Sequence, residues 1–404
     1  MINSGDTAWV LISTALVILM TPALGFFYAG MVRKKNILST LMLSVVMLAL
    51  ITVQWMLYGY SLSFGTDHAG IIGGLNWLGL NGVGATVHEG YAPTIPHLLF
   101  MFFQLAFAVI TPALITGAFV ERIKFPSFLL FSLLWVTFIY APVAHWVWGI
   151  GGWLRAMGAL DFAGGIVVHI TAGISALAVA LVIGKRKGYG KTPMEPSNIP
   201  LTVLGAFLLW FGWFGFNGGS ALSASSIAVS AVVATNAAGA SAALTWMLLN
   251  WMHKRPSLLG FSTGAIVGLA AVTPASGFIS PLSALIIGVV AATLSYYMII
   301  FRLKVGLDES LDVFACHGIG GIWGTLALGL FAQKAINATG NDGLFFGNPG
   351  FFGIQIFAVL IVVLFSFVGT YFLAKVVDTL FSLRSKESEE DVGLDLAYHG
   401  ETTY

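Results

Sequence analysis

The sequence predicts an all-α integral membrane protein of about eleven transmembrane helices, and three observations support this class. Of the 404 residues, 58% are hydrophobic and 9% are charged, whereas soluble domains carry about 25% charged residues. The mean hydropathy is +0.91, and apolar runs of membrane-spanning length recur along the chain. The basic residues gather in alternate loops. A soluble fold would have too little polar surface to face water, whereas a bilayer solvates an apolar exterior.

The apolar runs set the number of predicted helices. A hydrocarbon core about 30 Å thick requires roughly 20 helical residues, each rising about 1.5 Å. The first run has no Lys or Arg before it and exceeds the length of a signal peptide, so we expect it to be retained as a membrane helix. The eleven runs lie near residues 8–31, 37–62, 96–120, 126–147, 161–184, 199–219, 225–251, 258–276, 281–301, 313–333 and 351–382.

The charged residues predict the orientation. The net charge is only +1, which indicates no nucleic-acid surface. Of the 18 Lys and Arg residues, 15 follow odd-numbered runs, and the exceptions are Arg155, Lys334 and Lys375. By the positive-inside rule, the N-terminus lies outside, the C-terminus is cytoplasmic, and the protein spans the cell membrane. The basic clusters lie at residues 33–35, 122–124, 185–191, 254–255, 302–304 and 384–386.

An internal repeat relates two parts of the chain. Residues 169–174 read His-Ile-Thr-Ala-Gly-Ile and residues 317–322 read His-Gly-Ile-Gly-Gly-Ile, with Asp161 and Asp312 upstream. The two copies are five spans apart, and an odd number reverses the direction of the chain. This pattern is typical of transporters built from inverted repeats. We therefore expect spans 1–5 and 6–10 to be related halves, followed by an eleventh helix.

His169 and His317 are the ionisable residues that we single out within the spans. Such residues are costly in a membrane and are candidates for function. His169 follows Asp161 by eight residues, a rise of about 12 Å, which places it near the middle of the bilayer. A neutral histidine bonded to a backbone carbonyl is the ordinary alternative. Two histidines at matching places in inverted repeats favour a shared central site.

Metal and enzyme chemistry find no support in the sequence. Zinc needs three or four ligands, and the spans offer no further His or Cys cluster beside the single Cys316. His97 and His145 lie near outer span ends, where solvation costs little. No catalytic motif of a hydrolase, nucleotide-binding protein or metalloprotease is present. We predict no metal, no cofactor and no enzymatic activity.

The two upstream carboxylates have structural and functional interpretations. Asp161 opens a span before Ala-Gly-Gly, where a carboxylate caps free backbone N–H groups. Capping is the favoured role, and binding of a cation is the alternative. Asp312 is interpreted as a helix-start residue that pairs with Arg302 or Lys304.

Aromatic residues gather toward the outer side. Phe103 and Phe107 share one face of the third span, and Trp148 follows the fourth. Each alone is expected to anchor the protein at the lipid interface. Together they would hold a small cation through its attraction to the ring faces. A second polar and aromatic set at the outer end of the sixth span comprises Trp213, Phe216, Asn217 and Ser220.

These motifs resemble those of the Amt/Mep/Rh ammonium transporters. The segment Asp-Phe-Ala-Gly-Gly-Ile-Val-Val-His at 161–169 is similar to the family signature, and Asp-Val-Phe-Ala-Cys-His-Gly at 312–318 is similar to its counterpart in the tenth span. Further similar segments lie at residues 25–36, 212–220 and 393–401. The resemblance covers nearly the whole chain.

The resemblance implies roles for individual residues. It implies a gate of two stacked rings, an outer site that recruits ammonium, a pair of pore histidines and one structural carboxylate. The Trp at position 148 favours the Amt branch over the Rhesus branch. The implied residues are Phe107 and Phe216 in the gate, Phe103, Phe107, Trp148 and Ser220 at the recruitment site with Gln104 beside it, His169 and His317 in the pore, and the carboxylate of Asp161.

The resemblance also implies the function and the partners. The expected substrates are ammonium or ammonia and methylammonium, and the expected assembly is a homotrimer with one pore per subunit. A PII-type signal protein is the expected cytoplasmic partner. Residues 1–383 would form the transmembrane domain and residues 384–404 a cytoplasmic regulatory tail. Whether ammonia, ammonium, or ammonia with a separate proton crosses is left open.

Two other functions remain as alternatives. An ammonium sensor with little conduction would usually carry a fused signalling domain, for which we expect the tail to be too short. An ion-coupled transporter of another small solute would be expected to show broken helices and additional ion-binding groups.

The tail has two interpretations. The acidic run at residues 387–391 alone is typical of a mobile, solvated end. The apolar residues that follow predict docking against the basic cytoplasmic loops instead, and they are Val392, Leu394, Leu396 and Tyr398.

Overall fold

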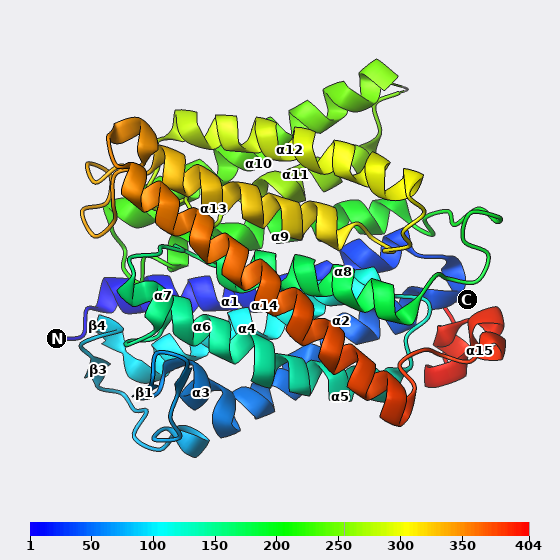
Figure 1. Cartoon of the computed structure of the whole chain (residues 1–404), viewed down its shortest axis with the longest axis horizontal. Helices are drawn as coiled ribbons and strands as arrows, with labels where there is room; N and C mark the ends of the chain where they lie inside the picture. Colours follow the sequence, from blue (N-terminus) through cyan, green and yellow to red (C-terminus); the bar gives the residue numbers. More distant parts are fainter. Residues whose placement is uncertain (254, 404) are drawn as a thin grey trace.

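The structure is a computed structural model that describes residues 1–253 and 255–403. Lys254, which belongs to the basic cluster at 254–255, lies outside the described residues. The helices run side by side along the long axis, with the N-terminus at one end, and α14 crosses the others obliquely (Figure 1). In chain order the helices are α1 Ser4–Met31, α2 Ile37–Gln54, α3 Tyr60–Phe64, α4 His97–Ile115, α5 Phe125–Trp135, α6 Ala141–Trp148, α7 Trp153–Ala156, α8 Thr171–Ile183, α9 Ile199–Gly219, α10 Ser226–His253, α11 Leu258–Val272, α12 Pro281–Lys304, α13 Gly320–Phe331, α14 Pro349–Phe381 and α15 Glu387–Val392.

Several of these helices join into longer spans through wider, π-helical turns. Within the described part of the chain, ten continuous helical segments are long and apolar enough to cross a membrane. The predicted run at 258–276 forms α11, whose 15 residues rise only about 22 Å. It packs among α9, α10, α12 and α13. The π-helical turns are η2 Trp55–Gly59, η5 Val136–Tyr140, η6 Gly165–Ile170, η7 Phe314–Ile319 and η9 Asp395–His399.

The first helices of the two predicted halves, α1 and α9, pack closely and antiparallel. A Cβ added to Gly30, at the end of α1, would meet the start of α9 at Asn198. A Cβ added to Gly219, at the end of α9, would meet Ser13 near the start of α1. Small residues let membrane helices approach at backbone distance. This pair therefore joins the two halves along their full length.

We call the end of the bundle that holds Ser4 and the strands the N face, and the opposite end the C face. The long loop before α4 covers the N face with two small antiparallel sheets. His97 and His145, which the sequence places near outer span ends where solvation costs little, are both buried. His97 Nε2 lies 2.6 Å from the Tyr60 hydroxyl, and His145 lies between the Ser63 carbonyl and Asp67. The strands are β1 Asp67–His68, β2 Ile72–Gly73, β3 Val87–His88 and β4 Ala92–Pro96.

A buried charge cluster joins the loops of the C face. Glu121 receives bonds of 2.9 Å from both Arg33 and Arg186, and Arg186 also pairs with Asp308 at 2.7 Å. Burial alone would raise the pKa of Glu121, but the two guanidinium groups outweigh it and lower that pKa. The predicted pairing of Asp312 with Arg302 is present at 2.7 Å. These ion pairs hold loops from both halves together.

The tail docks on the basic loops of the C face. Lys35 donates to the carbonyls of Glu390 and Asp391 at 2.5 and 2.8 Å. Asp395 accepts two bonds, of 3.0 and 2.7 Å, from N–H groups at the start of α2. An anionic cap at a helix N-terminus is favourable because the backbone dipoles leave partial positive charge there.

Only part of the expected apolar contact in the tail is made. Leu394 is buried, and its N–H donates to Asn36. Val392 and Leu396 are half-exposed instead of docked. Hydrogen bonds and ion pairs therefore hold the tail more than apolar burial does.

Candidate functional site

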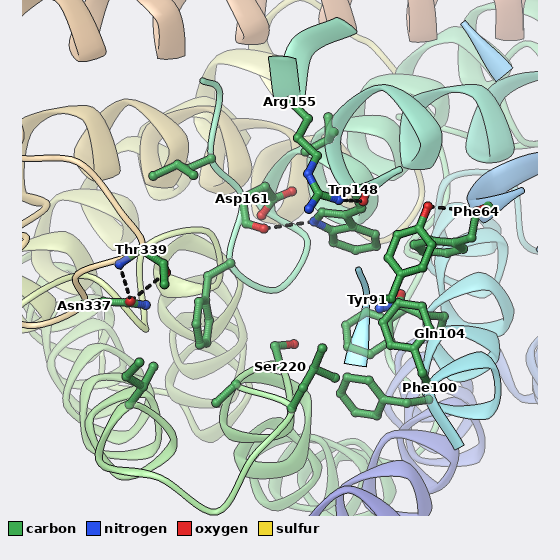
Figure 2. A pocket seen from close by; sticks show the side chains of 18 of the residues that line it. Phe64, Tyr91, Phe100, Gln104, Trp148, Arg155, Asp161, Ser220, Asn337 and Thr339 are labelled. Atoms are coloured by element: carbon green, nitrogen blue, oxygen red, sulfur yellow. Dashed lines mark hydrogen bonds between the residues drawn. The ribbon is translucent and has the colours of Figure 1, made fainter. Parts of the chain in front are cut away.

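A cavity of about 410 Å³ opens at the N face. Aromatic rings form one wall, and the polar side chains of Gln104 and Ser220 also face it (Figure 2). The predicted residues Phe103, Phe107 and Trp148 all line this cavity. Segments far apart in the sequence, on α4, α6 and α9, thus meet at one site, and the predicted recruitment residues are brought together.

The geometry of α4 explains the aromatic wall. Residues four apart lie on the same face of a helix, and the ring centroids of Phe103 and Phe107 are 4.9 Å apart. Trp148 meets Phe107 edge-on, with centroids 6.0 Å apart and ring planes at 88°. Electron-rich ring faces of this kind attract a small cation.

Hydrogen bonds fix the position of Trp148. Its indole Nε1 donates to the carbonyl of Asp161 at 2.9 Å, and its own carbonyl accepts a bond of 2.5 Å from Arg155. On the facing side, the Ser220 hydroxyl donates to the Phe216 carbonyl at 2.8 Å. The Ser220 oxygen faces the cavity (Figure 2) and has lone pairs that accept hydrogen bonds from a ligand.

Asp161 caps the start of the helix that carries His169. Its Oδ1 accepts from the N–H groups of Gly164 and Gly165 at 2.8 and 2.7 Å, and its Oδ2 accepts from Ile166 and Val167 at 2.7 and 3.0 Å. Gly164 has a φ of 124°, a conformation that favours glycine. Of the two interpretations of Asp161, this geometry favours the capping role.

Two phenylalanine rings close the floor of the cavity. Phe107 and Phe216 have ring centroids 4.4 Å apart, with planes tilted by 44°. Each is only 1% exposed. Phe107 lines the N-face cavity, whereas Phe216 lines a second, smaller one beneath it. The two rings therefore stand between the cavities.

The predicted histidine pair lies in the second cavity, whose volume is about 10 Å³. The Nδ1 atoms of His169 and His317 are 3.2 Å apart, although 148 residues separate them in sequence. One Nδ1 must donate and the other accept, so the two Nε2 atoms differ in protonation. The pair thus offers one donor and one acceptor. Among the described residues, His169 Nε2 is buried without a partner.

Both histidines lie in π-helical turns, His169 in η6 and His317 in η7. Such turns are rare and often occur at functional sites. The segments that carry them approach closely because glycine lines their crossing. A Cβ on Gly173, in α8 just after η6, would overlap the backbone of Gly318 in η7. The His169 ring also stacks on Phe216, with centroids 5.9 Å apart. The repeated histidines and glycines were visible in the sequence, but the helix widening was not.

Sequence reasoning missed several residues that line the cavity, among them Arg155, Asn337 and Thr339. Asn337 and Thr339, in the loop after α13, lie on the side of the cavity opposite Tyr91 and Phe100 (Figure 2). Asn337 is buried, and its side-chain oxygen accepts two bonds from Thr339. Neither residue lies in a predicted span, and no motif identified them.

Comparisons with known proteins agree on the family. The family model described as Ammonium Transporter Family matches residues 8–404. The chain is 51% identical over 402 residues to "Ammonium transporter Amt1" of Archaeoglobus fulgidus, covering 100% of both proteins, and 48% identical to "Ammonium transporter" of Bacillus subtilis, covering 99% and 98%. Among solved structures, that of Candida albicans Mep2 matches with a TM-score of 0.91 at 36% identity, covering 100% of this chain and 91% of that one. A structure titled "Sensor Amt Protein" matches with a TM-score of 0.89 at 29% identity, covering 98% of each.

Proposed function

The chain belongs to the ammonium transporter family, and from this premise we propose a route for the substrate. Ammonium is captured in the N-face cavity, passes the two phenylalanine rings and moves along the histidine pair. The chain is a multi-pass membrane transport protein and not an enzyme. The observation that carries the proposed route is a chain of contacts. Phe107 faces the cavity and contacts Phe216, which in turn stacks on His169.

Capture relies on the aromatic wall and Ser220. Cation–π contacts contribute about 2 kcal/mol when the cation is desolvated. The rings of Phe107 and Trp148 supply this attraction, and the Ser220 oxygen accepts a hydrogen bond that ammonium can donate. Methylammonium retains donor N–H groups and fits the same site.

Passage beyond the rings favours a species that can lose its proton. A bare charge at mid-bilayer costs about 3 kcal/mol even on the lenient insertion scale, and the second cavity is apolar apart from the histidines. Ammonium can leave its proton to a base, whereas potassium has none to lose. The unpartnered Nε2 of His169 is suited to accept a hydrogen bond from the nitrogen species or to relay its proton. Selectivity thus follows from proton chemistry more than from size.

Half-saturation kinetics test the capture site. We expect Trp148→Leu, Phe107→Ala and Ser220→Ala each to raise the methylammonium concentration needed for half-maximal uptake by about tenfold or less, since each removes roughly 1 kcal/mol of contact. Trp251→Leu is the matched control, because Trp251 is exposed on α10 and lies outside the cavity. Unchanged concentration dependence in all three variants, with selectivity over potassium intact, would refute the capture site.

The proposed placement in the cell follows from the basic loops. The basic clusters at residues 33–35 and 185–187 lie on the C face with the docked tail, so we propose that this face is cytoplasmic and that the N face opens outside the cell membrane. We also propose a homotrimer with one pore in each subunit. A mass measurement of the purified protein in detergent tests the trimer, and a monomeric or dimeric mass would exclude it.

A PII-type signal protein is the proposed regulator, and residues 384–404 form the proposed regulatory tail. Three equivalent weak contacts on a trimer would gain strength through effective concentration. The ordered docking of the tail through Lys35 and Asp395 supports a defined surface for a partner on the C face. Deleting the residues after Arg384 should weaken capture of PII without preventing membrane insertion. If the truncated protein bound PII as tightly as the full-length protein does and transported normally, this proposal would be refuted.

Electrical recording identifies the transported species. Current measured alongside ammonium flux in liposomes separates neutral ammonia from charged transport. If one positive charge crosses with each nitrogen atom transported, the species is ammonium, or ammonia with a separate proton. Flux without current indicates ammonia alone.

A further inference from the structure

One positively charged residue lies at the opening of the N-face cavity. The guanidinium of Arg155, on α7, is exposed and lines the same cavity as Trp148 and Ser220 (Figure 2). It is one of only two Lys or Arg residues that the sequence places in the loops of this face, the other being Lys334. A fixed positive charge beside a site that gathers cations opposes the capture proposed above, so its presence requires an explanation.

The local geometry holds this charge in place. Trp148 is the last residue of α6, and the final carbonyls of a helix have no partner within the helix. Arg155 Nη1 donates to the Trp148 carbonyl at 2.5 Å, and a cation is favoured at a helix C-terminus. The guanidinium is therefore fixed beside the tryptophan that forms the aromatic wall.

The neighbouring titratable groups do not cancel the charge by pairing with it. The other titratable groups that line the cavity are Asp161 and Tyr91. Both oxygens of Asp161 are occupied by four backbone N–H groups. Burial raises the pKa of Tyr91 to about 12, so this phenol stays neutral and donates to the Phe64 carbonyl. Arg155 thus acts on the cavity as a cation that lacks an ion-pair partner among the described residues.

We propose that Arg155 determines the affinity and ion specificity of capture through its charge. It raises the ammonium concentration needed for half-saturation, and it repels divalent cations twice as strongly as monovalent ones, because the Coulomb energy scales with the product of the charges. Monovalent ammonium overcomes the repulsion through its ring contacts and its hydrogen bond. The aromatic site is in this way kept free of magnesium and calcium. This inference rests on the proposed capture site.

Two substitutions separate the charge of Arg155 from its hydrogen bond. Arg155→Gln removes the charge but keeps an N–H donor, whereas Arg155→Lys keeps the charge but loses the planar fork. Lys334→Gln is the matched control, because it removes the same charge from the same face at an exposed residue outside the cavity. Monodisperse elution of each variant in detergent verifies that it is folded.

Methylammonium uptake is measured at ionic strengths of about 0.01 and 0.15 M, where the Debye length is roughly 30 and 8 Å. We expect Arg155→Gln to lower the half-saturating concentration about two- to fivefold at low salt, and by less at high salt, because exposed charges are screened. It should also make uptake sensitive to external Mg²⁺. Arg155→Lys and Lys334→Gln should behave as the unsubstituted protein does.

Three results would overturn the inference. They are an unchanged half-saturation in Arg155→Gln, a change that salt does not reduce, and the same change in Arg155→Lys or Lys334→Gln. Trp148→Leu, measured in parallel, separates this inference from the capture site itself. If Trp148→Leu alters half-saturation and Arg155→Gln does not, only the role of Arg155 is wrong. If neither alters it, and Phe107→Ala and Ser220→Ala also leave half-saturation and selectivity over potassium unchanged, the capture site is wrong as well.

Discussion

Removing the carboxylate of Asp161 should destabilise the protein and stop transport. The change Asp161→Ala leaves four backbone N–H groups without their acceptor, at Gly164, Gly165, Ile166 and Val167. Asp161 is 7% exposed, so water cannot fully replace the carboxylate. The same N–H groups begin the π-helical turn that carries His169. Both stability and the position of the histidine therefore depend on this residue.

The four bonds set the size of the effect. A hydrogen bond to a charged group contributes about 1.5–3 kcal/mol, so four sum to roughly 6–12 kcal/mol. Contributions within one network are not additive, and some water will enter, so we expect a loss of about 3–6 kcal/mol. Proteins have a free energy of unfolding of about 5–15 kcal/mol. The variant should be marginal or unfolded at growth temperature.

The assay combines thermal unfolding in detergent with methylammonium flux in liposomes. Asp161→Glu keeps the charge and should recover part of both. Asp342→Ala is the matched control, because Asp342 accepts a single exposed bond from the Lys334 backbone, and its loss should cost less than about 1 kcal/mol. If Asp161→Ala had the same midpoint of unfolding and the same flux as the unsubstituted protein, the four bonds would not stabilise the helix that carries His169.

Further predictions concern the pore, the tail and the orientation. His169→Ala combined with His317→Ala should abolish flux or admit potassium, measured by flux and current in liposomes; wild-type flux and selectivity would contradict a shared site. Gly173→Ala should lower the unfolding temperature, because its Cβ would overlap the Gly318 backbone, and an unchanged temperature would exclude this contact as a constraint. Asp395→Asn should weaken the cap on α2 by about 0.3–1 kcal/mol and speed proteolysis of the tail. Equal cleavage rates in the variant and the unsubstituted protein would contradict a role of this cap in docking the tail. Thr403→Cys should react with impermeant reagents only from the cytoplasmic side, since the native cysteine is buried; labelling from outside intact cells would reverse the proposed topology.

The spans and their pattern could be predicted because they depend on local composition. Burial in lipid requires about 20 consecutive apolar residues for each helix, and that requirement is readable from any window of the chain. Ten of the predicted runs are long apolar helices among the described residues, and the run at 258–276 is the shorter α11. α11 could be short because neighbouring helices surround it, which no single window reveals.

The site could be predicted in its residue types but not in its geometry. The resemblance named Phe107, Phe216 and the two histidines, and the inverted repeat indicated independently that the histidines occupy matching places. The repeat could not predict that their Nδ1 atoms lie 3.2 Å apart, because that distance depends on glycine contacts between helices from opposite halves.

Composition, hydropathy and charge along the chain were enough to predict the membrane class, the spans and the segregation of basic residues, and the motifs named several of the residues that line the two cavities. Only the packing of the helices and loops against one another established which polar atoms have partners. It buried His97 and His145 against groups of α3 instead of water, and it brought Arg155 from a short helix onto the carbonyl of Trp148. Periodicity along a chain reports the burial of each segment, whereas a hydrogen bond depends on tenths of an ångström between segments, and only their packing sets that distance.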